Sequence, residues 1–361
     1  MKTNLLFGRS RIGKALLFCG IMITLLFNTS VFAQKRIVLH HLGQASVYWN
    51  IDSLRTHIQT GDTIYFPGAG YNIGDWSIDK TVTIYGTGHY PDSTAATGIT
   101  YLTGNFIFKS GSSNSFIQGL YLTGSITLGS TSGNQVVNNL TISRCNFYNL
   151  YLSYDGGTTT TSNNIQIRDN VITGDGFYGG NATNVLVTNN FIQSVVGYFT
   201  NTLFKNNIMM RGGFCYGGPF SYMNNCSFQN NVMYYTWSSC GGNYFMSNCF
   251  TNDFQYNAFM WAPGFPDGSN TGSNNWNNIS AATFFVSQSG TSFNYTHNYH
   301  LQEPATYVGS DATQISLYGT TTPYKDGAVP INPHIRAKTI APNTTTSGQL
   351  NVNITVAAQD N

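Results

Sequence analysis

The sequence has 361 residues, of which 8% are charged and 14% are aromatic, and 16 Lys and Arg against 14 Asp and Glu give a formal net charge of +2. Few charges combined with many aromatic side chains argue against an intrinsically disordered chain. The nearly neutral balance excludes the strongly basic surface on which nucleic-acid binding depends.

Residues 1–33 have the features of a secretory signal peptide. Four basic residues precede an uncharged apolar run, Ala15–Phe27, and the segment ends on the small residue Ala33. Because a membrane-spanning helix needs roughly 20 apolar residues, we expect cleavage after Ala33 rather than an uncleaved anchor. The protein is then secreted or held at the cell surface, with the periplasm as an open alternative, and no later segment is apolar enough to cross a membrane.

Removal of this segment takes four basic and no acidic residues, so 12 basic and 14 acidic residues remain and the formal charge becomes −2. This balance again disfavours a nucleic-acid partner. No break in composition divides the rest of the chain into two globular halves, and repeat architectures often reach this length as one unit.

One pattern recurs along the chain: apolar, any, apolar, two polar positions, Asn, any, apolar. Clear copies are Ile165–Ile172 and Val185–Ile192. The alternating apolar residues are expected to point into a core, and Asn suits the corner that follows because it tolerates the left-handed backbone conformation. We expect the repeated asparagines to form one hydrogen-bonded ladder, made of Asn170, Asn190, Asn207, Asn231, Asn257 and Asn298, with Cys145 in the Asn position of an early copy.

The spacing of this pattern predicts a stack of coils. From Cys145 to Asn257 the successive intervals are 25, 20, 17, 24 and 26 residues, and the 41 residues to Asn298 fit two coils. Apolar residues that recur every second position exclude a helical solenoid, and an antiparallel sandwich would not place one Asn at coil-length intervals. The sequence therefore predicts an all-β parallel β-helix, a solenoid of about 10–12 coils.

Three stretches resemble the pectin-lyase-like superfamily of right-handed parallel β-helices. Asp52–Gly88 is similar to the family's opening, in which a short amphipathic helix covers the N-terminal end and the first coil follows; Asp52 is then the expected N-cap. The Asn repeat is the second stretch, and Asn298–Gly327 is similar to the way many exported β-helix proteins close their last coil. The resemblance implies the fold but no single activity, because this superfamily hosts lyases, hydrolases, esterases and non-enzymatic surface proteins.

The expected organisation is a signal peptide at 1–33, a β-helix domain with its N-terminal cap at 34–322, and a tail at 323–361. The tail holds Pro330, Pro333 and Pro342 before an alternating stretch that ends at Val356. We interpret it as a linker and one or two strands that cover the C-terminal end or pack along the stack. A separate small appendage is the alternative.

Five cysteines follow the signal peptide. Their spacing lacks the paired CxxC arrangement of a zinc site, so sulfur ligation of a metal is not expected. Similar flanking residues suggest two disulfides between neighbouring coils, Cys215 with Cys240 and Cys226 with Cys249, and buried free thiols are an equally weighted alternative. The fifth residue, Cys145, stays unpaired.

Few residues suit catalysis. As the resemblance implies, lyases of this fold hold calcium with carboxylates from adjacent coils and use Arg or Lys as the base, whereas hydrolases need paired carboxylates. Asp155 and Asp175 fall in consecutive coils and Arg211 follows two coils on. They are the candidates for a catalytic or calcium site, with turn-capping aspartates and a solvated arginine as the alternative. No other cofactor is expected.

Other charged and titratable residues favour structural roles. Arg144 and Asp169 take the same position in adjacent coils, which predicts a surface ion pair. His297 and His300 flank the last Asn and are expected at ladder corners, because no third residue completes a metal site with them.

Aromatic residues cluster after the repeats of two neighbouring coils, where the chain has left the core strand. Exposed on a flat wall they would stack against sugar rings, and packing on one another is the alternative. We therefore expect an exported, non-catalytic protein that binds polysaccharide or cell-surface glycan, with a polysaccharide lyase or glycoside hydrolase as the alternative. The candidate glycan-binding residues are Tyr234, Tyr235, Trp237, Tyr244 and Trp261.

Overall fold

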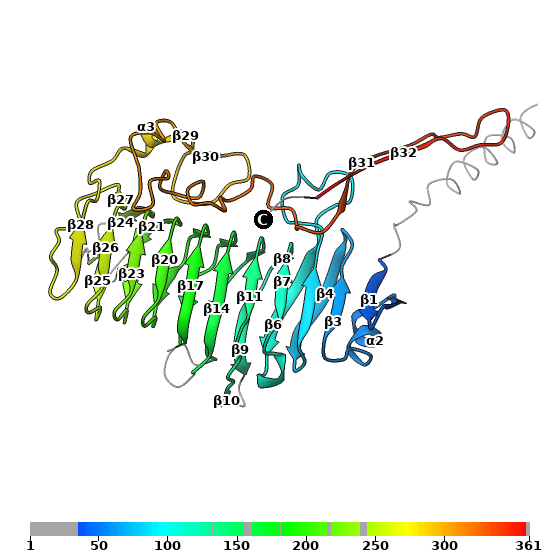
Figure 1. Ribbon diagram of the computed structural model, residues 1–361, viewed down its shortest axis with the longest axis horizontal. Coiled ribbons are helices and arrows are strands. Elements are labelled where there is room, and N and C mark those ends of the chain that lie inside the picture. Colours follow the sequence, from blue (N-terminus) through cyan, green and yellow to red (C-terminus); the bar gives the residue numbers. More distant parts are fainter. Residues whose placement is uncertain are drawn as a thin grey trace, which may run out of the picture. The chain divides into compact units, whose positions relative to one another are not determined.

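The computed structural model describes residues 35–130, 133–154, 161–180, 182–214, 218–238 and 244–358. The predicted signal peptide lies outside these residues. From Arg36 onward the chain forms one compact unit, and Figure 1 shows its strands stacked side by side along one axis. Across the described ranges, no helix has the length and apolar character needed to pass through a membrane.

Among the described residues, ten parallel strands, one for each coil, form the first row of the solenoid. Antiparallel β1 (Ile37–His41) and β2 (Gln44–Tyr48) extend this sheet beyond the first coil. The predicted parallel β-helix is therefore confirmed. The strands of the first row are β3 (Asp62–Tyr65), β5 (Val82–Tyr85), β7 (Phe116–Gln118), β11 (Thr141–Ser143), β14 (Asn163–Arg168), β17 (Thr183–Thr188), β20 (Leu203–Lys205), β23 (Ser227–Gln229), β26 (Asp253–Gln255) and β28 (Thr271–Ser273).

A second sheet forks at β6 (Tyr101–Phe108), which pairs with both β8 and β9, and so supplies two further rows. β4 (Gly70–Ile78) precedes the fork, and β10 (Gly133–Asn134) pairs with β9. The second row is β8 (Tyr121–Leu122), β12 (Asn146–Phe147), β15 (Val171–Ile172), β18 (Phe191–Ile192), β21 (Ile208–Phe214), β24 (Val232–Trp237) and β27 (Ala258–Phe259). The third row is β9 (Ile126–Ser130), β13 (Leu150–Tyr151), β16 (Gly176–Tyr178), β19 (Val195–Gly197), β22 (Phe220–Ser221) and β25 (Met246–Ser247).

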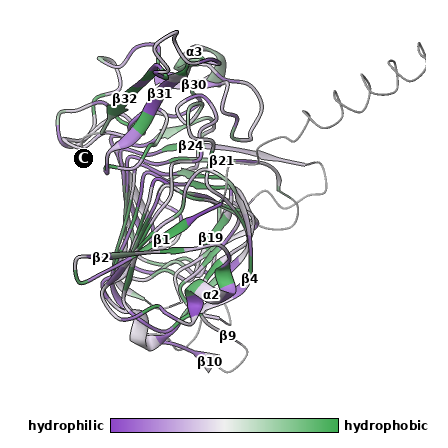
Figure 2. Ribbon diagram, turned by 90° about the vertical axis from the view of Figure 1, so that its right-hand side faces the viewer, coloured by the Kyte–Doolittle hydropathy of each residue, from purple (hydrophilic) through white to green (hydrophobic). Residues whose placement is uncertain are grey.

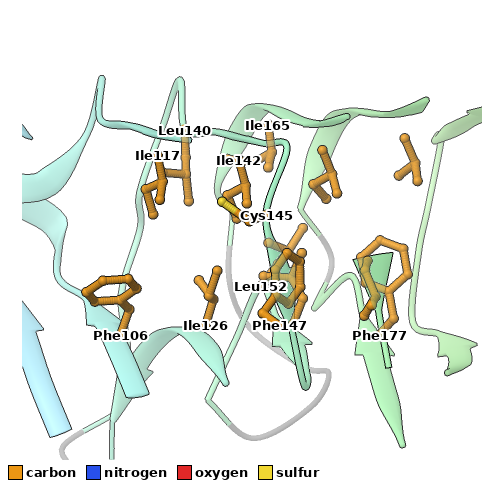
Figure 3. Packing of buried hydrophobic residues seen from close by; sticks show 14 of the residues in the cluster. Phe106, Ile117, Ile126, Leu140, Ile142, Cys145, Phe147, Leu152, Ile165 and Phe177 are labelled. Carbon is orange, nitrogen blue, oxygen red and sulfur yellow. The ribbon is translucent and has the colours of Figure 1, made fainter. Parts of the chain in front are cut away.

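The coils stack in register, so equivalent apolar side chains meet inside the solenoid. Ile167 of β14 pairs with Val187 of β17, which pairs with Phe204 of β20, and all three are fully buried. Figure 3 shows Ile117, Ile142 and Ile165 on one side of this core, facing aromatic and aliphatic residues of the other rows. Stacking of the coils thus buries the apolar surface that a single coil would leave exposed.

The N-terminal end is covered by α2 (Ile51–Arg55), whose Ile51 and Leu54 are buried. The predicted helix is present, but Asp52 is not its N-cap. Asn50 takes that role, because its Oδ1 accepts a hydrogen bond from the backbone N–H of Ser53 at 2.7 Å. Asp52 lies in the exposed first turn, where an acidic side chain interacts favourably with the helix dipole.

The coils end at β28, earlier than the expected boundary at residue 322. The Phe265 ring stacks on Phe254 with centroids 4.9 Å apart and covers the last coils. Residues 280–331, which we call the strap, then run back along the outside of the second row (Figures 1 and 2). The strap begins with α3 (Ala281–Phe284), β29 (Phe285–Ser287) and β30 (Asn298–Leu301).

The strap and the second row enclose a second apolar core. Phe191 and Ile208 of the second row belong to it together with strap residues that include Phe284, Tyr299 and Leu317, and the Phe191 ring contacts Tyr299. The stretch around Asn298 is therefore not a coil, and the expectation that residues 298–327 close the last coil is wrong. The second row is apolar on both faces, so its outer face has to be covered by another segment.

The tail contains the two expected strands, β31 (His334–Ile340) and β32 (Val352–Ala357), paired as an antiparallel hairpin. This hairpin does not cover the C-terminal end. His334 and Arg336 instead line a cavity together with Tyr90 and Asp92, which follow the second coil strand of the first row.

Candidate functional site

The repeated asparagines form a buried column at the corner between the first and second rows. The Asn190 backbone N–H and its Nδ2 both donate to Oδ1 of Asn207, at 2.9 and 3.0 Å. The column begins where the Cys145 backbone N–H donates to Asn170, and it continues beyond the expected members to Asn275. Its asparagines are Asn170, Asn190, Asn207, Asn231, Asn257 and Asn275.

Asn298 is not part of this column, contrary to expectation. It lies in β30 of the strap, is exposed, and accepts hydrogen bonds from His300. A second buried column went unrecognised in the sequence: the Cys226 N–H donates to Asn252, and Asn252 donates to Asn270. These residues take the first position of the repeat. The copies Ile165–Ile172 and Val185–Ile192 have an apolar residue at that position, so the sequence did not reveal a second column of polar residues.

The residue before each ladder Asn has a positive φ, and several of these side chains bond to the strap. Asn206 Nδ2 donates to the Ser316 carbonyl at 2.9 Å, and Arg144 Nη1 donates to the Val329 carbonyl at 3.0 Å. Arg144 and Asp169 are neighbours in this column, with Nε and Oδ2 4.0 Å apart, but their side chains are only 2% and 9% exposed. The ion pair is therefore buried beneath the strap and not on the surface.

Two of the three catalytic candidates come together. Arg211 Nη2 lies 2.8 Å from Oδ1 of Asp175, and the Tyr148 hydroxyl donates to Oδ2 of Asp175 at 3.2 Å. Both charged residues line a groove of about 450 Å³, walled by Thr173, Gln193, Gly212, Gly213, Thr236, Thr291 and Ser292. Asp155 lies outside the described residues. Among the described lining residues Asp175 is the single carboxylate, and its partner is a guanidinium.

The five predicted glycan-binding aromatics do not form one exposed platform. Tyr235 is 3% exposed, because β24 alternates and turns this side chain into the solenoid with Met233. Trp237 and Trp261 pack edge to face at 5.2 Å against the same core. Tyr234 packs against the second core, and Tyr244 alone is strongly exposed, at 62%.

A different aromatic row lies on the outer face of the third row of strands. Tyr151, Tyr178, Tyr198 and Tyr222 come from four successive coils, with neighbouring ring centroids 5.5, 5.5 and 4.8 Å apart. The last two rings are stacked at 10°, and Tyr222 is 46% exposed. We call these four residues the tyrosine row.

The local backbone makes room for these rings. A Cβ on Gly176 would lie 2.8 Å from the Tyr151 ring, so only glycine allows that ring to lie over the next coil. Tyr198 and Tyr222 adopt φ of 58° and 51°, a conformation that is unusual for bulky residues. Because these tyrosines stand outside the repeated Asn pattern, the sequence interpretation missed them.

The ion pair of Asp175 and Arg211 lies beside the tyrosine row. Burial raises the pKa of Tyr178, while the nearby guanidinium of Arg211 lowers it and the carboxylate of Asp175 raises it. A shorter aromatic series on the first row, Tyr65, Tyr85 and Phe116, has similar ring spacings of 5.6 and 5.7 Å. The tyrosine row thus combines aromatic rings with a charged hydrogen-bonding pair.

The two histidines are not at ladder corners. His300 stacks on Tyr318 in the strap, and His297 hydrogen-bonds to Tyr299 and Ser289. The part of the chain that the structure describes contains no group of three or more His, Cys, Asp or Glu side chains arranged to hold a metal ion.

Cys226 and Cys249 are free, buried thiols and form no disulfide. Their coils are in register with an offset of 26 residues, which aligns Cys226 with Asn252 and Met223 with Cys249. The similarity of their flanking residues implied an offset of 23 and was misleading. Cys145 is also free and buried, and burial raises its pKa to about 12. Cys215 and Cys240 lie outside the described residues.

Comparison with known proteins gave no match to a protein-family model, a curated protein or a solved structure. The site has to be interpreted from its own geometry.

Proposed function

We propose that this is an exported, non-catalytic β-helix protein that binds polysaccharide or cell-surface glycan along the tyrosine row. The observation that carries the proposal is the line of four rings across four coils, flanked by Asp175 and Arg211. A sugar ring has an apolar C–H face and a hydroxyl edge. Tyrosine rings pack against such a face, and the charged pair hydrogen-bonds to hydroxyls.

A binding role has more support than catalysis. A hydrolase needs a second carboxylate within roughly 5–9.5 Å of the first, and among the described residues Arg211 occupies the place beside Asp175. The parallel coils and the buried Asn column support placing the chain with the pectin-lyase-like superfamily, which the sequence resembles. Because one fold can carry many activities, the proposed function rests on the geometry of the site and not on the fold.

A glycan-array screen of the purified protein, scored for both retention and product formation, tests this proposal. Tyr222→Ala and Arg211→Gln are expected to weaken retention about tenfold or more. Tyr65→Ala, in the aromatic series of the first row, is the matched control and should leave retention unchanged. New reducing ends or unsaturated products, or equal loss in the control, would refute the proposal.

A further inference from the structure

A second hollow lies between the strap, the segment that follows β5 and the hairpin strand β31. Its volume is about 650 Å³, within the range of pockets that hold small molecules. It shares no residue with the tyrosine row. The side chains that decide its chemistry are Tyr90, Asp92, His300, Tyr318, Asp326 and Arg336.

A flat platform forms one wall of this cavity. The His300 imidazole lies on the Tyr318 ring with centroids 3.7 Å apart and an interplanar angle of 14°. The Tyr318 hydroxyl donates to Oδ1 of Asp326 at 2.8 Å, and His300 Nε2 lies 3.8 Å from Oδ2 of the same carboxylate. Asp326 therefore holds the Tyr318 ring and lies beside the imidazole, while His300 stays 43% exposed.

The part of the lining that follows β5 is joined to the strap. The Ser93 hydroxyl donates to the Gly327 carbonyl at 2.9 Å, and the Tyr90 and Tyr324 hydroxyls are 2.9 Å apart. Asp92, next to Ser93, is exposed. Because these bonds join segments more than 230 residues apart, the cavity is preformed, and a ligand does not have to assemble it.

Charge and shape together define the ligand. Besides its imidazoles, the described lining carries the carboxylates of Asp92 and Asp326 against the single guanidinium of Arg336. Carboxylates accept hydrogen bonds from hydroxyls but repel an acidic ligand. A flat aromatic wall suits a ring with one apolar face. We propose that this cavity binds one ring of a neutral saccharide, as a site separate from the tyrosine row.

The test is an NMR titration of the full chain, labelled on histidine, at pH 7. The probes are glucose, galactose, mannose, xylose and their neutral oligosaccharides, with glucuronate and galacturonate as acidic counterparts. We expect neutral saccharides to shift the His300 signals, identified by their loss in His300→Ala. Asp92→Asn, at an exposed position that leaves the fold intact, and His300→Ala are each expected to weaken binding about tenfold or more. In His300→Ala the affinity is measured from the signals of His297 and His334, which line the same cavity.

Tyr222→Ala serves as the control and should leave the His300 shifts and the affinity unchanged. Binding that is lost in Tyr222→Ala but kept in Asp92→Asn and His300→Ala would overturn this inference and support the proposed function. Binding of uronates alone, or no shift of the His300 signals with any neutral saccharide, would also overturn it. Thermal melting of each variant separates lost binding from lost folding.

Discussion

Arg144 Nη1 donates to the carbonyl oxygen of Val329 at 3.0 Å, across 185 residues of sequence. The guanidinium is 2% exposed and has the Asp169 carboxylate as its charged neighbour. One buried side chain therefore joins the corner of a coil to the strap. The strap buries apolar residues on the outer face of the second row, so its attachment is part of the stability of the whole unit.

Replacing Arg144 should therefore destabilise the protein strongly. Arg144→Ala leaves the Asp169 carboxylate buried without its partner, and we expect the free energy of unfolding to fall by about 3–5 kcal/mol. Arg144→Met combined with Asp169→Asn should recover part of this loss, because no buried charge remains. Urea unfolding monitored by circular dichroism measures both. Arg336→Ala, at an exposed position, should change the value by less than about 0.5 kcal/mol; a similar small effect for Arg144→Ala would contradict the prediction.

Two buried groups should give opposite dependences of stability on pH. Burial lowers the pKa of His89 to about 3. Between pH 6.5 and 3, His89 therefore binds a proton in the unfolded chain but not in the folded protein. His89 therefore does not reduce the free energy of unfolding above pH 6.5, and it reduces this free energy progressively as the pH falls below 6.5. Burial raises the pKa of Asp169 to about 6 despite Arg144, so between pH 6 and 3.8 the folded protein holds a proton that the unfolded chain releases. This group adds stability as the pH falls.

At pH 5 the two effects nearly cancel. The loss from His89 and the gain from Asp169 are each on the order of 1–2 kcal/mol. His89→Asn should therefore make the protein more stable at pH 5 than at pH 7, and Asp169→Asn should make the acid loss steeper. Urea midpoints at both pH values measure this difference independently of the baseline cost of each variant. If the stability of the wild-type protein, His89→Asn and Asp169→Asn changed with pH in the same way, the prediction for these two groups would be wrong.

The ladder allows a comparison of two asparagines that the repeat pattern treats alike. Asn207 Nδ2 donates to the Val187 carbonyl and to Asn231, and its Oδ1 accepts from Asn190, whereas Asn298 is exposed in the strap. Asn207→Ala leaves several buried polar groups without partners and should lower the free energy of unfolding by about 3 kcal/mol or more. Asn298→Ala should cost less than about 0.5 kcal/mol. Chemical denaturation gives the free energy of unfolding of both variants. Equal losses in Asn207→Ala and Asn298→Ala would contradict the exposed position of Asn298.

The repeat predicted the coils because one local rule, alternating apolar residues before an Asn corner, acts in successive coils from Asn170 to Asn257. Asn170 and Asn190 follow that rule and stack as expected. Asn298 has the same neighbours in sequence, but nothing in its own segment reveals that the outer face of Phe191 and Ile208 needs a cover. The strap depends on contacts between residues 78 to 234 positions apart in sequence, which a local pattern does not contain. The tyrosine row escaped notice for a related reason, since Tyr198 and Tyr222 align only when the length of each coil is known.

The register of neighbouring coils also decides the state of two thiols. Cys226 aligns with Asn252, and Cys249 aligns with Met223, so the sulfurs stand three positions apart along their coils. Burial raises the pKa of both thiols, that of Cys226 to about 12, which suppresses the reactive thiolate. We expect both cysteines to resist iodoacetamide in the native protein at pH 8 and to react rapidly in urea without a reductant. Peptide mapping by mass spectrometry gives the state of each site, and a Cys226–Cys249 crosslinked peptide from the unreduced protein would show that the register of these coils is wrong.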